Sequence, residues 1–318
     1  SNEYSHHNYE GKQPSSFYSY LDDKSFIDLE KDISNNNTES YLYVKANPFK
    51  KFKIGAGIRK NLPHKNQINY WSKQINFRYN ITKSNSLLLS AGDYNGYSDP
   101  YRNIRDIHQI SSNQYTFEHL MNYKLFSLSY ALFYKEETIP LNPQPYQTIS
   151  PLRIKGIEIA SKFTITKMIE TNVTYSYMNT KMKLDNFWQR YYTDNSNILK
   201  CSLRYTNPKL FNFGINFFYQ SGKYFHNIIA NSVPNRGNIS SRSYYNDKLN
   251  NYYSLNLSAN KYIKLKDVGI VCFFNINNIL NHKNPSYAYY NEDYTEISYR
   301  YLQARMIYFG IQLDLNNI

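Results

Sequence analysis

The chain has 318 residues, a mean hydropathy of −0.67 and a formal net charge of +13. No apolar run reaches the about 18 residues that a membrane-spanning helix needs, so a helical membrane protein is excluded. Lys and Arg are scattered along the whole chain, whereas nucleic-acid binding requires them on one stripe, so no nucleic-acid partner is expected. Aromatic residues make up 17%, with 35 Tyr, and this proportion is typical of barrels with aromatic girdles.

From residue 39 onward, apolar and polar residues alternate with period two, the pattern of β-strands whose two faces differ. Residues 1–37 are polar, so we expect a loop there, with a strand fragment near residues 17–21. The alternation predicts about thirteen strands, at residues 39–47, 52–60, 71–81, 86–94, 112–123, 125–135, 154–166, 171–180, 198–206, 211–221, 253–262, 269–280 and 305–315. Cys201 and Cys272 fall on apolar strand faces and are interpreted as small hydrophobic residues rather than a disulfide.

The connections between these strands alternate between short turns and long loops. Short turns lie near Pro48, Lys83, Lys124, Lys167, Pro208 and Lys266, and long loops are centred near Arg102, Pro143, Phe187, Arg236 and Tyr290. A soluble sandwich has no reason to sort its connections this way, whereas transmembrane barrels place short turns in the periplasm and long loops outside. The chain is therefore predicted to be all-β and to form a transmembrane antiparallel β-barrel in the bacterial outer membrane.

The terminal segment, residues 305–315, shows the alternation most clearly. One face reads Ile307, Phe309, Ile311, Leu313 and Leu315, and the other reads Met306, Tyr308, Gly310, Gln312 and Asp314. Its length suits one tilted crossing of a bilayer, with the apolar face toward lipid and the polar face toward a wet interior. Gly310, Leu313 and Leu315 also resemble the C-terminal assembly signal of outer-membrane barrels, and three further residues follow it here.

The predicted strand number suggests that the chain is part of a larger barrel. Residues 1–38 are assigned to an extracellular loop or N-terminal extension, and residues 39–318 to the C-terminal part of the barrel. Thirteen is odd, whereas bacterial single-chain barrels have even numbers, so we expect earlier strands in the same gene product or on a second chain. No signal peptide precedes Ser1, so we expect that it was removed or that the gene product begins upstream.

Four pieces of the sequence resemble the C-terminal part of TonB-dependent outer-membrane receptors of the Bacteroidetes type. They are residues 76–80 with 90–94 and Pro100; Lys155-Gly156-Ile157-Glu158 with residues 173–177; residues 220–224; and residues 274–281 with 305–315. The resemblance implies a plugged 22-stranded barrel, a size that plugged outer-membrane transporters are known to have. It also implies import of a scarce nutrient such as a ferric siderophore, haem, cobalamin or an oligosaccharide, driven by the TonB complex.

The same resemblance implies partners. These are an N-terminal plug and early barrel strands, the TonB complex acting through the N-terminal region, lipopolysaccharide and lipid around the barrel, and a surface lipoprotein as a further candidate. Two alternatives remain open from the sequence: a self-contained passive porin of 12 to 14 strands, with a strand between residues 17 and 33, and a soluble β-rich glycan-binding protein.

The long outer loops concentrate aromatic and basic residues, which suit ligand capture because aromatic planes stack on sugars or catecholates and Arg pairs with carboxylates or phosphates. The candidate ligand-binding residues are Tyr97, Tyr101, Arg102, Arg105, Trp188, Arg190, Tyr191, Arg236, Arg242, Tyr244, Tyr245, Tyr289 and Tyr290. The alternative for most of them is contact with the membrane interface and lipopolysaccharide. Inward-facing Arg78, Arg204 and Lys162 are expected to pair with carboxylates of the barrel lumen or the plug.

No enzyme constellation is present in the sequence. It lacks a Gly-rich phosphate loop, a nucleophile elbow and a spaced Cys/His metal set. Catalysis, a cofactor and a bound metal are therefore not expected. The sequence does not specify which ligand is imported.

Overall fold

A computed structural model describes residues 2–14, 26–63, 69–97, 109–140, 149–184, 186–191, 194, 196–227, 245–265, 268–293 and 295–315. The long strands are β1 (Asn2–Pro14), β2 (Phe26–Phe49), β3 (Phe52–Pro63), β4 (Trp71–Asn80), β5 (Asn85–Tyr97), β6 (Gln109–Asn122), β7 (Phe126–Pro140), β8 (Ile149–Thr164), β9 (Ile169–Leu184), β11 (Asn197–Thr206), β12 (Asn212–Gln220), β15 (Tyr252–Leu265), β16 (Val268–Asn277) and β19 (Met306–Leu315). Five short strands lie between them: β10 (Phe187–Arg190), β13 (Tyr224–Phe225), β14 (Asp247–Lys248), β17 (Pro285–Tyr290) and β18 (Ile297–Tyr301). No helix in this described part of the chain is long and apolar enough to span a membrane.

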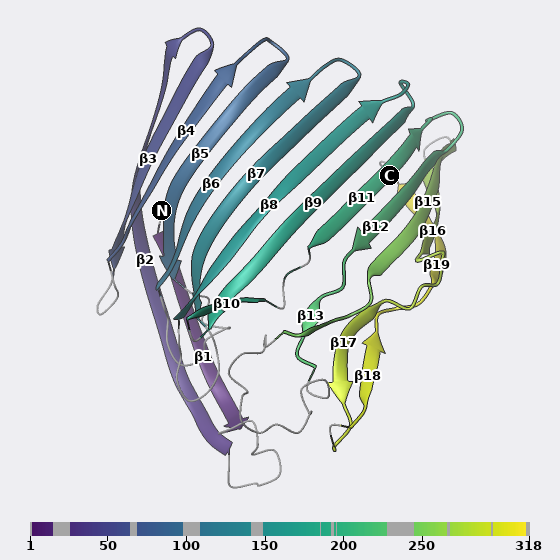
Figure 1. The fold of residues 1–318 in the computed structure, drawn as a ribbon. Coiled ribbons are helices and arrows are strands. Elements are labelled where there is room, and N and C mark those ends of the chain that lie inside the picture. Colours follow the sequence, from purple (N-terminus) through teal and green to yellow (C-terminus); the bar gives the residue numbers. More distant parts are fainter. Residues whose placement is uncertain are drawn as a thin grey trace.

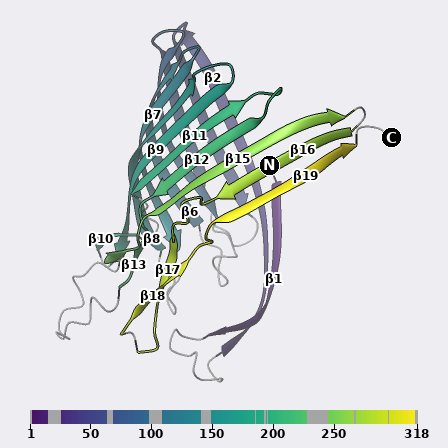
Figure 2. The same ribbon diagram turned by 90° about the vertical axis from the view of Figure 1, so that its right-hand side faces the viewer.

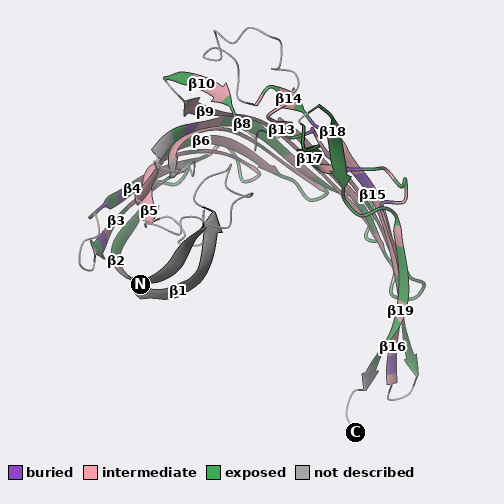
Figure 3. Ribbon diagram, turned by 90° about the horizontal axis from the view of Figure 1, so that it is seen from below, coloured by how far each residue is buried: buried purple, intermediate pink, exposed green. Residues whose placement is uncertain are grey.

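The long strands form one antiparallel sheet in which each strand pairs with its neighbours in the chain. The order runs from β1 to β9, then β11, β12, β15, β16 and β19, with β10 paired onto β9. The sheet curves into an open arc, and among the described residues its two edge strands, β1 and β19, do not pair (Figure 3). All thirteen strands predicted from residue 39 onward are present, and the predicted fold class is confirmed.

The connections are sorted to opposite ends of the sheet, as predicted. In Figure 1 the tight turns between β2 and β3, β4 and β5, β6 and β7, β8 and β9, and β11 and β12 lie at the upper end, where β15 also ends and β16 begins. The strand ends that precede and follow the longer connections lie at the lower end, together with the strand pairs β13–β14 and β17–β18. We call these the turn end and the loop end of the sheet.

The register gives the sheet one apolar and one polar face. At the C-terminal edge, Ile307, Phe309 and Ile311 of β19 lie opposite Ile276, Phe274 and Cys272 of β16. These side chains face no core: Phe309 is 81% exposed and Ile311 is 69% exposed. A soluble monomer rarely exposes so continuous an apolar surface, so this face requires another apolar phase.

The opposite face of the sheet is polar, and it carries the residues that alternate with the apolar ones along each strand. Asn76, Arg78 and Asn80 of β4 lie opposite Ser90, Leu88 and Ser86 of β5, and Lys162 of β8 lies opposite Asn172 of β9. Cys201 and Cys272 are free thiols, in agreement with the sequence interpretation.

The predicted loop over residues 1–37 is wrong for most of its length. Residues 2–14 form β1, and β2 begins at Phe26, so that the two strands pair along thirteen positions from Asn2–Thr38 to Pro14–Phe26. Residues 2–14 do not alternate apolar and polar residues, and residues 26–37 alternate only briefly, at Ile27-Asp28-Leu29-Glu30, so the period-two signal was too weak to predict these strands. The strand fragment expected near residues 17–21 lies outside the described residues. The assignment of residues 1–38 to the extracellular side stays a prediction.

Candidate ligand-binding site

The predicted ligand-binding residues that the structure describes all lie at the loop end of the sheet. They are Tyr97 at the end of β5, Trp188 and Arg190 on β10, Tyr191 directly after it, Tyr245 before β14, and Tyr289 and Tyr290 on β17. Tyr101, Arg102, Arg105, Arg236, Arg242 and Tyr244 lie outside the described residues. The loop end therefore carries the described candidate residues for ligand binding.

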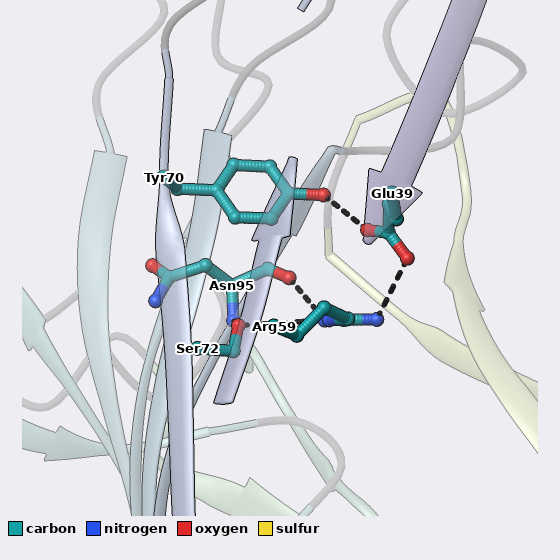
Figure 4. A network of polar contacts seen from close by, with 5 residues as sticks. All are labelled: Glu39, Arg59, Tyr70, Ser72 and Asn95. Carbon is teal, nitrogen blue, oxygen red and sulfur yellow. Dashed lines mark hydrogen bonds and ion pairs between the residues drawn. The ribbon is translucent and has the colours of Figure 1, made fainter. Parts of the chain in front are cut away.

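A polar network that the sequence did not reveal ties β2, β3, β4 and β5 together at this end (Figure 4). Arg59 on β3 donates from Nη1 to Glu39 Oε2 at 3.1 Å and from Nη2 to the backbone oxygen of Asn95 at 2.7 Å. Tyr70, only 4% exposed, donates from its hydroxyl to the other Glu39 oxygen at 2.8 Å. Each oxygen of the Glu39 carboxylate thus has a hydrogen-bond partner within the protein. The network therefore holds the strand ends together, and a role in ligand binding is not needed to explain it.

Tyr97 belongs to the same region. Its hydroxyl accepts a hydrogen bond from Asn61 Nδ2 at 3.0 Å, and its ring lies 5.4 Å from that of Tyr70 in an edge-to-face arrangement. Asn61 is fully buried and its Oδ1 also accepts from the Tyr70 backbone nitrogen at 2.6 Å. Tyr97 is therefore held by contacts within the protein.

Around β10, a second network is built on a buried carboxylate. Asp194 has no exposed surface, and it accepts hydrogen bonds from the Thr180 backbone nitrogen at 3.1 Å and from Arg190 Nη1 at 3.3 Å. Burial raises the pKa of the Asp194 carboxyl above its ordinary value, and its hydrogen bond with Thr180 and the charge of Arg190 only partly oppose this. The segment after β10 is thereby anchored to β9.

Arg190 extends this network to the next loop. It also donates to the Tyr224 hydroxyl on β13 at 2.6 Å, with its guanidinium 4.8 Å from the Tyr224 ring. Tyr191 meets Tyr245 edge-to-face at 6.1 Å, and the Tyr290 hydroxyl donates to the backbone oxygen of His226 at 2.5 Å. Segments far apart in the sequence thus form one unit, which we call the loop assembly (residues 187–191, 194, 224–227, 245–248, 285–293 and 295–301).

The loop assembly borders a cavity of about 340 Å³ beside the ends of β12 and β15. Phe218 and Tyr252, whose rings meet edge-to-face at 5.4 Å, form its aromatic wall. The remaining lining residues are Gln220, Ser221, Gly222, Lys223, Leu249, Asn250, Pro285, Ser286 and Leu302. Gly222 is required there because a Cβ would lie 1.6 Å from the Leu249 backbone oxygen. An aromatic wall with amide and ammonium groups suits a small polar or anionic ligand.

None of the predicted ligand-binding residues that the structure describes lines this cavity. Trp188 packs against Arg153 of β8, whose guanidinium lies 4.1 Å from the indole ring, and Tyr289 meets Tyr287 at 6.2 Å. Of the inward cations, Lys162 pairs with the lumen carboxylate Glu170 at 2.6 Å, as expected. Arg78 instead donates to Asn80 Oδ1 and Ser86 Oγ, each at 3.1 Å. Within the described residues no group of three or more His, Cys, Asp or Glu side chains is placed to hold a metal ion.

No protein-family profile matches the chain, and no curated protein matches its sequence. Solved structures nevertheless share its fold. The ferric yersiniabactin uptake receptor FyuA from Yersinia pestis matches with a TM-score of 0.65 and 12% identity, over 87% of this chain and 45% of the receptor. FpvA from P. aeruginosa, in complex with a heterologous pyoverdine, matches with a TM-score of 0.65 and 14% identity, over 98% of this chain and 44% of FpvA. The ferric-catecholate import receptor Fiu from K12 E. coli matches with a TM-score of 0.64 and 11% identity, over 98% of this chain and 50% of Fiu.

These three proteins are TonB-dependent outer-membrane receptors, and the chain has the fold of their barrel wall. The resemblance inferred from the sequence is confirmed at that level, and the Bacteroidetes assignment stays a prediction. The chain spans about half the length of the receptors that it matches (45%, 44% and 50%).

Proposed function

We propose that this chain supplies wall strands and ligand-binding outer loops to a TonB-dependent outer-membrane importer of a scarce nutrient. The observation that carries the proposal is a curved antiparallel sheet with an exposed apolar face and with aromatic and basic residues of its described connections at the loop end. Such a sheet suits a barrel wall with lipid on one side and a polar lumen on the other.

The open sheet favours a larger barrel. Within the described residues its main path contains fourteen strands, and a 22-stranded barrel of the plugged type would need about eight more. We propose that these strands and a plug come from the same gene product or a second chain. The apolar face then contacts outer-membrane lipid, the loop end lies outside the cell, and residues 1–38 extend the outer surface.

The cargo class is proposed from the site and from the proteins that share the fold. Their names include receptors for yersiniabactin, pyoverdine and ferric catecholates, together with a copper transporter. We propose a ferric siderophore as the first candidate, with haem, cobalamin and oligosaccharides as the others, and TonB as the energy-coupling partner. A surface lipoprotein remains a proposed partner. Binding and transport, not catalysis, are the proposed activity.

Uptake measured in cells tests this proposal. A receptor carrying this chain is expressed in a strain that lacks its own receptors, and a panel of ⁵⁵Fe-loaded catecholates and hydroxamates, haemin, cyanocobalamin and a maltooligosaccharide is supplied. We expect accumulation of at least one probe, and we expect that accumulation to stop when TonB is deleted. Uptake of every accumulated probe at the same rate without TonB would contradict the proposal.

A passive porin is the second candidate, and two observations favour it. The main path of the sheet has fourteen strands, an even number, and β2 covers residues 26–33, where a porin was expected to have a strand. Against it, β1 and β19 do not pair among the described residues, so the sheet is not closed. A 37.8 kDa species that forms a stable open pore by itself in a planar bilayer would favour the porin.

A further inference from the structure

A second cavity, of about 250 Å³, lies on the polar face of the sheet across β2 to β5. Gln74 at its centre has the same parity along β4 as Asn76 and Arg78, which places it on the polar face. The residues that the argument uses are three tyrosines, Tyr41, Tyr43 and Tyr94, together with Gln74, Ser72 and Arg59. None of them is among the ligand-binding residues predicted from the sequence.

Two glycines shape this cavity. Tyr43 lies opposite Gly57, and Gln74 lies between Gly57 on one neighbouring strand and Gly92 on the other. A Cβ at Gly57 would lie 2.8 Å from Tyr43 Cδ2, and a Cβ at Gly92 would lie 2.6 Å from Tyr94 Cε2. The rings of Tyr43 and Tyr94 therefore lie against bare backbone, and Gln74 stands between them.

The polar groups of the cavity are only partly satisfied. Tyr94 donates from its hydroxyl to Gln74 Oε1 at 3.2 Å, which orients the amide. Within the described part of the chain, Gln74 Nε2 and the hydroxyl groups of Tyr41 and Tyr43 make no hydrogen bond. The Tyr41 side chain is also 74% exposed, so its ring is available to a ligand. The cavity thus offers an aromatic surface beside hydrogen-bonding groups.

The charges at the cavity are compensated. Arg59 is paired with Glu39 at 3.1 Å, and Figure 4 shows its guanidinium held between Glu39 and the backbone oxygen of Asn95. Lys73, which also borders the cavity, has the opposite parity to Gln74, so its side chain belongs to the other face, where Asp93 of β5 lies opposite it. Because burying an anion is costly unless a cation pairs with it, this cavity favours an uncharged ligand.

We propose that this cavity binds one uncharged pyranose ring of a carbohydrate. The C–H face of the sugar packs on Tyr41, and its hydroxyl groups bond with Gln74 Nε2 and the Tyr43 hydroxyl. The volume is below the about 300–1,000 Å³ of pockets for drug-sized ligands, which suits a single ring. The inference rests on the proposed function, because it takes the polar face as the import lumen, and it favours an oligosaccharide among the proposed cargoes. The cavity beside β12 and β15 differs because Lys223 lines it.

Isothermal titration calorimetry tests the proposal on the receptor that carries this chain, in detergent. The probes are maltotriose, cellotriose and mannotriose, and trigalacturonate is the anionic comparator. We expect at least one neutral trisaccharide to bind, and to bind more tightly than trigalacturonate. Tyr41→Ala should weaken that binding about tenfold and Gln74→Ala about fivefold. The matched control is Tyr308→Ala, on the polar face of β19 at the other edge of the sheet, which should bind as the unchanged protein does.

Three results would overturn the proposal: no binding of any neutral trisaccharide at millimolar concentration, equal binding by the unchanged protein and both cavity variants, or tighter binding of trigalacturonate. Circular dichroism verifies folding, and if Tyr41→Ala does not fold, Gln74→Ala decides. Uptake measurements separate this proposal from the transport function. TonB-dependent uptake of another probe without trisaccharide binding refutes the sugar site alone. Trisaccharide binding that requires Tyr41 and Gln74, without TonB-dependent uptake of any probe, supports the site and counts against the transport function.

Discussion

Replacing Gly310 by Ala tests why the C-terminal strand carries a glycine. Gly310 of β19 lies opposite Phe273 of β16, and a Cβ added at Gly310 would be 2.5 Å from Phe273 Cζ and 2.9 Å from Cε1. Carbon atoms in contact prefer separations of about 3.5–4.0 Å, so the ring would have to move by about 1 Å. Overpacking of this kind costs about 1–3 kcal/mol, and we expect the free energy of unfolding to fall by that amount.

The assay is denaturant unfolding in lipid vesicles, followed by the fluorescence of the two tryptophans, Trp71 and Trp188. Gly96→Ala is the matched control because an added Cβ there meets nothing within 4 Å. In a Phe273→Ala background the clash is absent, so Gly310→Ala should then cost less than about 0.5 kcal/mol. An equal cost in both backgrounds would refute the packing explanation and leave recognition of the assembly signal as the reason for this glycine.

Three further changes test the loop end. Tyr70→Phe removes a hydrogen bond to the Glu39 carboxylate and should lower the free energy of unfolding by about 1.5–3 kcal/mol. The control, Tyr115→Phe at an exposed ring, should change the free energy of unfolding little. Equal effects of the two substitutions would contradict a stabilising role of the network around Glu39. Gly222→Ala should disrupt the cavity, because its Cβ would meet the Leu249 backbone oxygen, and uptake of the transported probe should fall while the strand content measured by circular dichroism is kept. Burial raises the pKa of the Asp194 carboxyl, so the protonated carboxyl favours the folded state. This stabilising contribution is complete below the ordinary pKa of 3.8 and is lost as the pH rises through the raised pKa. The melting temperature of the unchanged protein should therefore fall relative to that of Asp194→Asn as the pH rises from 3.8 to 7, and a difference that is constant with pH would contradict this.

The long strands from residue 39 onward could be predicted from the sequence because apolar and polar residues alternate along them, and the structure gives them two different faces. Residues 305–315 alternate strictly, and the structure places β19 at Met306–Leu315. Residues 2–14 carry no such alternation, so only their pairing with β2 reveals β1. The strand β13 pairs with β14 more than twenty residues later in the chain, and a contact of this separation leaves no periodic signal.

The site was predictable only as a region. Aromatic and basic composition pointed to residues that the structure places at the loop end, but it could not distinguish Arg190, which anchors a buried carboxylate, from a free ligand contact. Glu39 and Arg59 form their ion pair across neighbouring strands, at a separation of twenty residues. Trp188 likewise reaches Arg153 only through the pairing of β8 with β9 and of β9 with β10, because the two residues are far apart in the sequence.

The central claim is that the curved sheet is a membrane wall with lipid on its apolar face and water on its polar face. The most direct measurement is site-directed fluorescence along β19, with Cys201 and Cys272 replaced by alanine and single cysteines placed at Ile311 or Gln312. A label at Ile311 should be quenched by brominated lipids and shielded from iodide, and a label at Gln312 should show the reverse, because side chains alternate across a strand. Equal quenching of both labels by iodide, with no effect of brominated lipid on either, would contradict the account.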